Sequence, residues 1–206
     1  PAKKAITNIG AQVKSAGDAR LKAGSNITFD TIEDKTTSTT TTTTKSKGRK
    51  TTETTSTTTV NQVKSGLTVG GNLAAQAGND LTLAGTDVNV GGSALLKAGN
   101  NVNLVARENS SESTTSTSSK GTGTFGSLKS SSSSTTNTQQ TRNVGTTLNV
   151  GGNAAVVAGQ TALVQGSDIK AGGNVVLKGT DVQVVAGQDT DTSSSTRKTL
   201  SLIHIS

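Results

Sequence analysis

Apolar residues recur at every second position in short runs that are separated by glycine-rich corners. The apolar pairs of one such unit are, in order, Leu73 and Ala75, Leu81 and Leu83, and Val88 and Val90. Alternate residues of a β-strand point to the same face, so each pair places two side chains inward. The pattern therefore predicts three short strands per unit, around a narrow interior of Ala, Val and Leu.

The same unit is written again 21 residues later along the chain. Gly71 recurs at Gly92, and Gly78 recurs at Gly99. A fixed period of about 20 residues with glycine corners is typical of a stacked solenoid, in which each coil buries its core against the next. We therefore predict an all-β fold, a parallel β-helix solenoid with three short strands per coil of about 20 to 21 residues.

The predicted coils indicate which side chains form the interior and which glycines form the turns. The expected structural core consists of Leu73, Ala75, Leu81, Leu83, Val88, Val90, Leu96, Val102, Leu104, Val156, Val164, Ile169, Val175, Leu177, Val182 and Val184. The expected turn glycines, which tolerate φ > 0, are Gly71, Gly78, Gly85, Gly92, Gly99, Gly152, Gly159, Gly166 and Gly173. Asx turns are expected at Asn72, Asp87, Asn153 and Asp168.

Three Ser/Thr-rich insertions interrupt alternate coils. They occupy residues 32–64, 107–146 and 187–199, and the third is incomplete. Each begins after the second strand of a coil, and the pattern resumes with the third strand, as at Leu67 and Leu148. One plain coil and one interrupted coil together make a superrepeat of 81 residues.

The composition of the insertions is compatible with two structures. Thr is β-branched and favours extended backbone, which suggests ribbons that turn near Gly48 and between Lys120 and Lys129. A polar low-complexity tract of this kind is also typical of disordered loops. Because an isolated two-stranded ribbon is marginal in water, we expect any ribbons to pair laterally with one another.

The two ends of the chain differ from the repeat. The expected solenoid fragment covers residues 5–199, and its N-terminus starts in the middle of the pattern, as if cut from a longer protein. Residues 200–206 break the composition and look like the translation of a transposase-type sequencing adapter. We expect this tail not to be native, so His204, the single histidine, stays outside the functional argument.

Composition narrows the function classes. Only 29% of the 206 residues are hydrophobic and 1% are aromatic, which alone favours disorder, but a repeat needs little core per coil. The absence of Cys excludes disulfides and thiolate metal sites. No apolar run of about 18 residues predicts a membrane span. The net charge of +7 is compatible with nucleic-acid binding. The Lys and Arg residues are scattered, however, and no aromatic residues accompany them on which bases could stack, so we expect no nucleic-acid partner.

Two patterns are candidates for chemistry, and a third, the calcium-binding repeat, is absent. Residues 121–126 fit G-x-G-x-x-G, but polar runs replace the flanking strand and helix that a nucleotide site needs. The nonapeptide of calcium solenoids is missing. Acidic residues cluster in the sequence at the start of each insertion. We expect these residues to have a structural role or to bind cations weakly, rather than to act in catalysis. They are Asp30, Glu33, Asp34, Glu108, Glu112, Asp189 and Asp191. We therefore expect no catalytic residue, no cofactor and no dedicated metal site.

Two stretches carry a resemblance to a known family. They are AGNDLTLAGTDVNVGG at residues 77–92 and LLKAGNNVNLVARENSSES at residues 95–113, and residues 158–195 repeat them loosely. They resemble the haemagglutinin repeat region of filamentous-haemagglutinin-like exoproteins, which include two-partner-secreted adhesins and the effector stalks of contact-dependent growth inhibition systems. The resemblance implies a secreted or cell-surface protein of Gram-negative bacteria, with a right-handed parallel β-helix.

The resemblance also implies a function without enzymatic activity. We expect a structural stalk segment involved in cell–cell contact, adhesion or toxin delivery, with an outer-membrane transporter of a two-partner secretion system as partner. An alternative is an adhesive module whose insertions bind a glycan or protein on the target cell. A third is a solenoid enzyme acting on polysaccharides, although outward positions lack the aromatic residues that hold sugars. The sequence leaves adhesin and toxin carrier as open alternatives.

Overall fold

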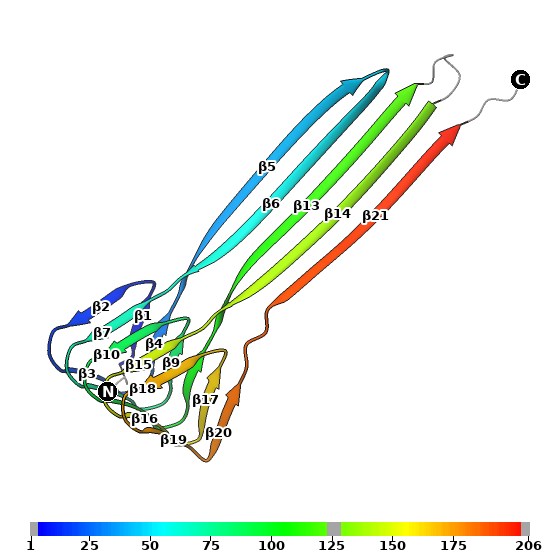
Figure 1. Cartoon of the computed structure of the whole chain (residues 1–206). Helices are drawn as coiled ribbons and strands as arrows, with labels where there is room; N and C mark the ends of the chain where they lie inside the picture. The colour runs from blue at the N-terminus through cyan, green and yellow to red at the C-terminus, as the bar shows by residue number, and fades with distance from the viewer. Residues whose placement is uncertain (1–3, 123–128, 203–206) are drawn as a thin grey trace, which may run out of the picture. The chain divides into compact units, whose positions relative to one another are not determined.

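The computed structural model describes residues 4–122 and 129–202 (Figure 1). In these ranges the regular structure consists of β-strands, which fall into two compact units. The first unit, called the solenoid, takes its residues from 1–34, 61–109 and 142–188. The second, called the ribbon sheet, takes its residues from 35–60, 110–141 and 189–206.

Three parallel sheets form the walls of the solenoid. Wall A contains, in spatial order, β1 (Ile6–Ile9), β4 (Ile27–Asp30), β9 (Leu81–Ala84), β12 (Val102–Val105), β17 (Thr161–Gln165) and β20 (Asp181–Val185). Wall B contains β2 (Gln12–Ser15), β7 (Gly66–Val69), β10 (Asp87–Val90), β15 (Thr147–Val150) and β18 (Asp168–Ala171). Wall C contains β3 (Ala19–Ala23), β8 (Leu73–Ala77), β11 (Ala94–Ala98), β16 (Ala154–Ala158) and β19 (Val175–Lys178). The chain visits the three walls in turn, so one strand from each makes a coil.

Equivalent residues of successive coils lie side by side. In wall A, Leu81 pairs with Val102, which follows it by 21 residues. In wall B, Val88 pairs with Leu67 on one side and with Leu148 on the other, across the second insertion. The parallel pairing and the three strands per coil confirm the predicted β-solenoid.

The interior of the solenoid is a continuous apolar column. The residues of the expected core that are buried are Leu73, Ala75, Leu81, Leu83, Val88, Val90, Leu96, Val102, Leu104, Val156 and Val164. Ile27 and Phe29 extend the column into the preceding coil and are 1% and 2% exposed. Each large apolar side chain buried in this way contributes about 1.5 to 3 kcal/mol, so the stack is stable although each coil holds few such residues.

The last coil departs from the expected core. Val175, Val182 and Val184 are 46%, 44% and 70% exposed, so their predicted burial is wrong. Their strands, β19 and β20, lie at the edges of walls C and A and are covered by a neighbouring strand on one side only. Ile169 and Leu177 are partly buried and pack against the core.

Glycine is required at the corners for two different reasons. Gly85 and Gly166 have positive φ angles of 52° and 54°. The other expected turn glycines do not, so positive φ explains only these two. A Cβ atom on Gly99 would lie 2.2 Å from the carbonyl oxygen of Gly78, and one on Gly159 would lie 1.9 Å from that of Gly99. The expected glycines at which an added Cβ would likewise lie within 2.5 Å of a neighbouring coil are Gly71, Gly78, Gly92, Gly152 and Gly173. Most corner glycines therefore serve the close stacking of coils.

The insertions form long strands that pair with one another. The ribbon sheet has the order β21-β14-β13-β6-β5 (Figure 1). Its strands are β5 (Ile32–Ser46) and β6 (Arg49–Val63) in the first insertion, β13 (Arg107–Thr122) and β14 (Lys129–Val144) in the second, and β21 (Thr190–Leu202) in the third. β6 pairs antiparallel with β13, and β14 pairs antiparallel with β21. The insertions thus take the ribbon form and pair laterally across insertion boundaries.

The first ribbon turns at two residues, Lys47 and Gly48. Their φ angles are 45° and 76°, and a two-residue type I′ hairpin requires φ > 0 at both central positions. The tip of the second ribbon, including residues 123–126 of the G-x-G-x-x-G stretch, lies outside the described residues. Of the adapter-like tail, Leu200 belongs to β21, and residues 203–206 lie outside the described residues.

Candidate functional site

The corner between walls A and B is where the first two insertions leave the solenoid and return to it. The chain passes from β4 into β5 and from β12 into β13, and it returns from β6 to β7 and from β14 to β15. We call this place the insertion corner. It comprises residues 30–33, 62–65, 84–87, 105–109, 143–147 and 165–168, all of which belong to the solenoid unit.

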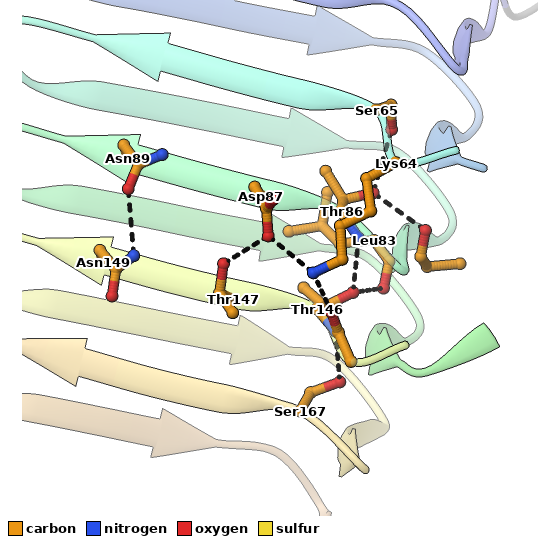
Figure 2. A network of polar contacts seen from close by, with 12 residues as sticks. Lys64, Ser65, Leu83, Thr86, Asp87, Asn89, Thr146, Thr147, Asn149 and Ser167 are labelled. Atoms are coloured by element: carbon orange, nitrogen blue, oxygen red, sulfur yellow. Dashed lines mark hydrogen bonds and ion pairs between the residues drawn. The ribbon is translucent and has the colours of Figure 1, made fainter. Parts of the chain in front are cut away.

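A ladder of hydroxyl groups runs through the insertion corner, at the position just before four of the five wall B strands, β7, β10, β15 and β18. The Oγ of Ser65 lies 3.1 Å from the Oγ1 of Thr86, and both residues are fully buried. The backbone N–H of Thr86 donates to the Oγ1 of Thr146 at 3.1 Å, and the N–H of Thr146 donates to the Oγ of Ser167 at 3.2 Å. Figure 2 shows these residues in line from one coil to the next. The ladder links four successive coils.

The same hydroxyls satisfy carbonyl groups at the ends of wall A strands. The Oγ1 of Thr86 donates to the carbonyl oxygen of Ala84 at 3.0 Å. The Oγ1 of Thr146 lies 2.9 Å from the carbonyl oxygens of both Leu83 and Val105, and its one proton serves one of them at a time. A buried polar group without a partner costs about 1 to 3 kcal/mol. Within the described ranges every buried side-chain nitrogen and oxygen has a partner, so the chain leaves the coil without that penalty.

An ion pair joins the roots of the first two insertions. The Nε of Arg107 donates to the Oδ1 of Asp30 at 2.7 Å, and its Nη2 donates to Oδ2. Burial raises the pKa of Asp30, but hydrogen bonds from Arg107 and from the N–H of Thr31 outweigh it and hold this pKa below its usual value. The bond to Asp30 in turn raises the pKa of Arg107.

Gln62 connects the same two insertions through its side-chain amide and its backbone N–H. Its Nε2 donates to the Oε1 of Glu33 at 3.3 Å and to the carbonyl oxygen of Glu108 at 3.2 Å. Its Oε1 accepts from the hydroxyl of Thr31, and its backbone N–H donates to the Oδ1 of Asn109 at 2.6 Å. The insertion roots are therefore fastened to each other as well as to their own coils.

Lys64 and Asp87 form a third contact, on the wall B side of the corner. The Nζ of Lys64 donates to the Oδ1 of Asp87 and to the carbonyl oxygen of Gly145, both at 2.9 Å. The hydroxyl of Thr147 donates to the same carboxylate oxygen at 2.7 Å (Figure 2). The two charged side chains are 30% and 45% exposed, so the ion pair is worth at most about 1 kcal/mol. Asp87 therefore bonds to adjacent coils, and its predicted Asx turn is wrong.

Asn side chains at the other corners also bond between coils. The Oδ1 of Asn72 accepts from the backbone N–H of Ser93 at 2.8 Å, and that of Asn153 accepts from the N–H of Asn174 at 2.8 Å. An Asx turn would instead bond within its own corner. The predicted Asx turns at Asn72 and Asn153 are therefore wrong, and these side chains form part of the stack.

Three of the acidic residues at the insertion exits have different partners. Asp30 bonds to Arg107, Glu33 bonds to Gln62, and Glu112 lies opposite Thr58 in the ribbon sheet. The residues that the structure describes contain no group of three or more His, Cys, Asp or Glu side chains that could hold a metal ion.

Among the described residues, the structure has no helix with the length and the apolar composition of a membrane-spanning segment.

The hydroxyl ladder was not anticipated from the sequence, although a signal for it exists. Ser65, Thr86, Thr146 and Ser167 each stand two residues before the first inward apolar residue of wall B. A small hydroxyl residue thus recurs at one repeat position on both sides of the insertions. The contact between Arg107 and Asp30 has no comparable signal in the sequence, because the two residues lie in different interrupted coils.

These contacts define the class of protein: a parallel β-solenoid of repeated coils whose polar corner anchors Ser/Thr-rich ribbons. The family model described as hemagglutinin repeat matches residues 43–130 and 125–204, which together cover most of the chain. The chain belongs to this family, the repeat region of filamentous haemagglutinin-like exoproteins.

The chain is similar to two much longer proteins. It is 29% identical over 196 residues to the tRNA nuclease CdiA of Escherichia coli (strain STEC_O31), and 30% identical over 195 residues to the tRNA nuclease CdiA of Yersinia mollaretii. These alignments cover 89% and 86% of this chain but 6% of each relative. No solved structure matches.

Proposed function

We propose that this chain is a stalk segment of a secreted bacterial exoprotein that takes part in cell–cell contact and toxin delivery. The observation that carries the proposal is the regularity of the coils, which hold the same register across two long insertions. Since each coil contacts mainly its neighbours, a solenoid is lengthened by adding coils without redesigning the rest. Such a segment serves to separate the functional parts of a long protein.

The dimensions fit a spacer that works in many copies. Strands in a sheet are about 4.8 Å apart, so the six strands of wall A span about 24 Å. The two relatives are each named a tRNA nuclease, and the aligned region is a small part of each. By analogy, this segment would lie between a surface-bound part and a toxin, and an outer-membrane transporter would export the whole protein.

A domain exchange tests the stalk role. Residues 5–199 would replace the aligned region of the Escherichia coli relative, followed by measurement of secretion, surface display and tRNA cleavage in neighbouring target cells. We expect all three to be retained, because a stalk depends on coil geometry and the two segments are only 29% identical. A chimera that is displayed normally but delivers no nuclease would contradict the stalk proposal.

An adhesive role for the ribbons is the second candidate, favoured by their exposed polar strands. Deletion of residues 106–144 joins Val105 to Gly145 and recreates the plain corner formed by Ala84 and Gly85, because Val105 is paired with Ala84 and Thr147 with Asp87. This variant keeps the coils and removes one ribbon. Unchanged attachment of variant-bearing cells to target cells would rule out adhesion through this ribbon, whereas loss of attachment would favour adhesion over the stalk role.

A further inference from the structure

Positive charge is concentrated at the tips of the ribbons. The ribbon sheet contains nine Lys and Arg residues against four Asp and Glu residues. Six of the nine lie at the hairpin ends of β5, β6, β13 and β14. They are Lys45, Lys47, Arg49, Lys50, Lys120 and Lys129. The tips therefore differ in charge from the Thr- and Ser-rich lengths of the same strands.

Three of these lysines form a row across adjacent strands. Lys120 on β13 is paired directly with Lys50 on β6. The hydroxyls of Thr43 and Thr52 lie 3.3 Å apart, and the register that brings them together places Lys45 opposite Lys50 two residues further on. We call Lys45, Lys50 and Lys120 the lysine row.

Among the described residues, no acidic side chain forms an ion pair with the lysine row. Like charges directly opposite each other on neighbouring strands destabilise a sheet. The ion pairs formed among the described residues are Lys64 with Asp87 and Arg107 with Asp30, neither of them in this row. All three lysines are exposed. The arrangement is therefore electrostatically unfavourable until an anion is bound.

Hydroxyl groups line the same face beside the row. Alternate residues of a strand share a face, so the face that carries Lys45 also carries Thr43, Thr41 and Thr39. Their hydroxyls lie 3.1 to 3.3 Å from the hydroxyls of paired residues on β6. A cavity of about 380 Å³ adjoins the row and is lined by Lys50, Lys120 and Lys129, and also by Leu200 of the adapter-like tail. This face combines aligned ammonium groups with rows of hydrogen-bonding hydroxyls.

We propose that the ribbon tips bind a linear acidic polysaccharide. The carboxylate groups of the polysaccharide would contact the lysine row, and its sugar hydroxyls would bond to the Thr and Ser hydroxyls of the same face. The described part of the ribbon sheet has no aromatic side chain on which nucleic-acid bases could stack. In the part of the tips that the structure describes, the large apolar residues are Leu200 and Leu202 on β21, which are too few to form the large apolar face by which interfacial segments enter a bilayer. The inference does not depend on the stalk proposal, and it names a ligand class for the adhesive role of the ribbons.

Polygalacturonate is a suitable probe, with neutral dextran for comparison. In a titration at low salt, we expect the chain to bind polygalacturonate but not dextran. The triple variant K45Q/K50Q/K120Q should bind about tenfold more weakly. The control K14Q/K22Q/K97Q, which removes the same charge from exposed solenoid lysines, should bind as the parent does. A chain ending at residue 199 should also bind as the parent does, since the adapter-like tail is outside the lysine row.

Several results would overturn the assignment. They are the absence of polygalacturonate binding by the parent, equal binding by parent and triple variant, and equal loss in the control variant. Tighter binding to single-stranded DNA or to phosphatidylglycerol vesicles would assign the row to another partner and contradict the polysaccharide. Circular dichroism checks the fold of each variant. If the triple variant does not fold, K50Q alone should still weaken binding by about threefold, and no loss would contradict the proposal.

Discussion

The solenoid and the ribbon sheet are both β-structures with long-range registers, but different interactions hold them. The wall strand β8 alternates buried and half-buried residues, and its inward side chains contribute to the apolar column. The ribbon strand β5 is exposed along all 15 residues. In the ribbon sheet, paired hydroxyls replace apolar contacts, as between Thr55 on β6 and Thr115 on β13, whose Oγ1 atoms lie 3.2 Å apart. One region is stabilised mainly by burial and the other mainly by backbone pairing with polar ladders.

This difference shows where the register of each region comes from. A slip of one residue in a wall strand would turn its apolar residues outward, so burial fixes the register of the solenoid. A ribbon strand has Thr and Ser on both faces, and a slip would expose no apolar side chain. The two-residue turn at Lys47 and Gly48 fixes the register within the first ribbon. Between the first and second insertions, Gln62 and Arg107 hold the roots together at the insertion corner.

The largest expected effect comes from removing an inward apolar side chain. Leu96 is 1% exposed in the column, whereas Leu95, the preceding residue of the same strand, points outward and is half-buried. Leu96→Ala should lower the free energy of unfolding by about 2 to 5 kcal/mol, because it leaves a cavity. Leu95→Ala is the matched control and should cost about 1 kcal/mol or less. Urea denaturation of both variants checks this, and equal losses would contradict the assigned faces.

A methyl group at a stacking corner should have the next largest effect. In Gly99→Ala the new Cβ would lie 2.2 Å from the carbonyl oxygen of Gly78, so the corners must move apart. We expect a loss of about 1 to 3 kcal/mol in the free energy of unfolding. An added Cβ at Gly17 meets nothing within 4 Å, so Gly17→Ala should be neutral or slightly stabilising. Thermal unfolding distinguishes the two, and a harmless Gly99→Ala would count against stacking as the reason for glycine.

The hydroxyl ladder can be broken at its centre. Thr146→Val keeps the β-branched shape but removes the acceptor for the N–H of Thr86 and the donor to the wall A carbonyls. The expected cost is about 1 to 3 kcal/mol, because these groups are buried. Thr28→Val, on the outward face of β4, should change the stability by less than about 0.5 kcal/mol. If both variants are equally stable in urea, the ladder does not contribute to holding the corner.

The ion pair at the insertion roots should have the smallest effect and a defined pH dependence. Its side chains are partly exposed, so Arg107→Gln should cost about 1 kcal/mol or less at neutral pH. The pKa of Asp30 is lowered by folding, so its contribution is present above the unfolded value and is lost as pH falls through the lower folded value. The stability difference between parent and variant should therefore be constant from about pH 5 to 7 and shrink below about pH 4.

Urea midpoints measured across this pH range test the prediction, with Lys22→Gln as a control. Lys22 is exposed and forms none of the described ion pairs. The control should therefore show no such pH-dependent difference from the parent. A difference for Arg107→Gln that stays constant down to pH values well below 4 would contradict a role for the Asp30 carboxylate.

The repeat makes the solenoid predictable from the sequence. The prediction is less accurate in the last coil, at the edge of the stack. Leu81 and Val102 share a repeat position, so their pairing follows from the sequence. The exposure of Val182 does not follow from the sequence, because the burial of a side chain depends on whether another coil covers it. The bond from Asn72 to the next coil does not follow from the sequence, since Asn and Asp side chains favour local turns as well.

The ribbons were harder to predict than the coils for a physical reason. Their composition is compatible with paired strands and with disorder, and only the lateral pairing of Thr57 with Ser113 and its neighbours distinguishes the two. The contact of Arg107 with Asp30 spans 77 positions, a separation set by the length of the first insertion rather than by the coil period. The lysine row is likewise defined by a register that the sequence does not specify.

The central claim is that consecutive insertions pair side by side in one register, and a cross-link tests it most directly. The chain contains no Cys, so T55C/T115C introduces a single possible disulfide between two residues that are paired across β6 and β13. T55C/T114C is the matched control, in which the two thiols lie on opposite faces of the sheet. The account predicts that mild oxidation closes the disulfide within the folded monomer of the first variant and not of the control. Failure of the first variant to cross-link, or equal cross-linking of both, would contradict it.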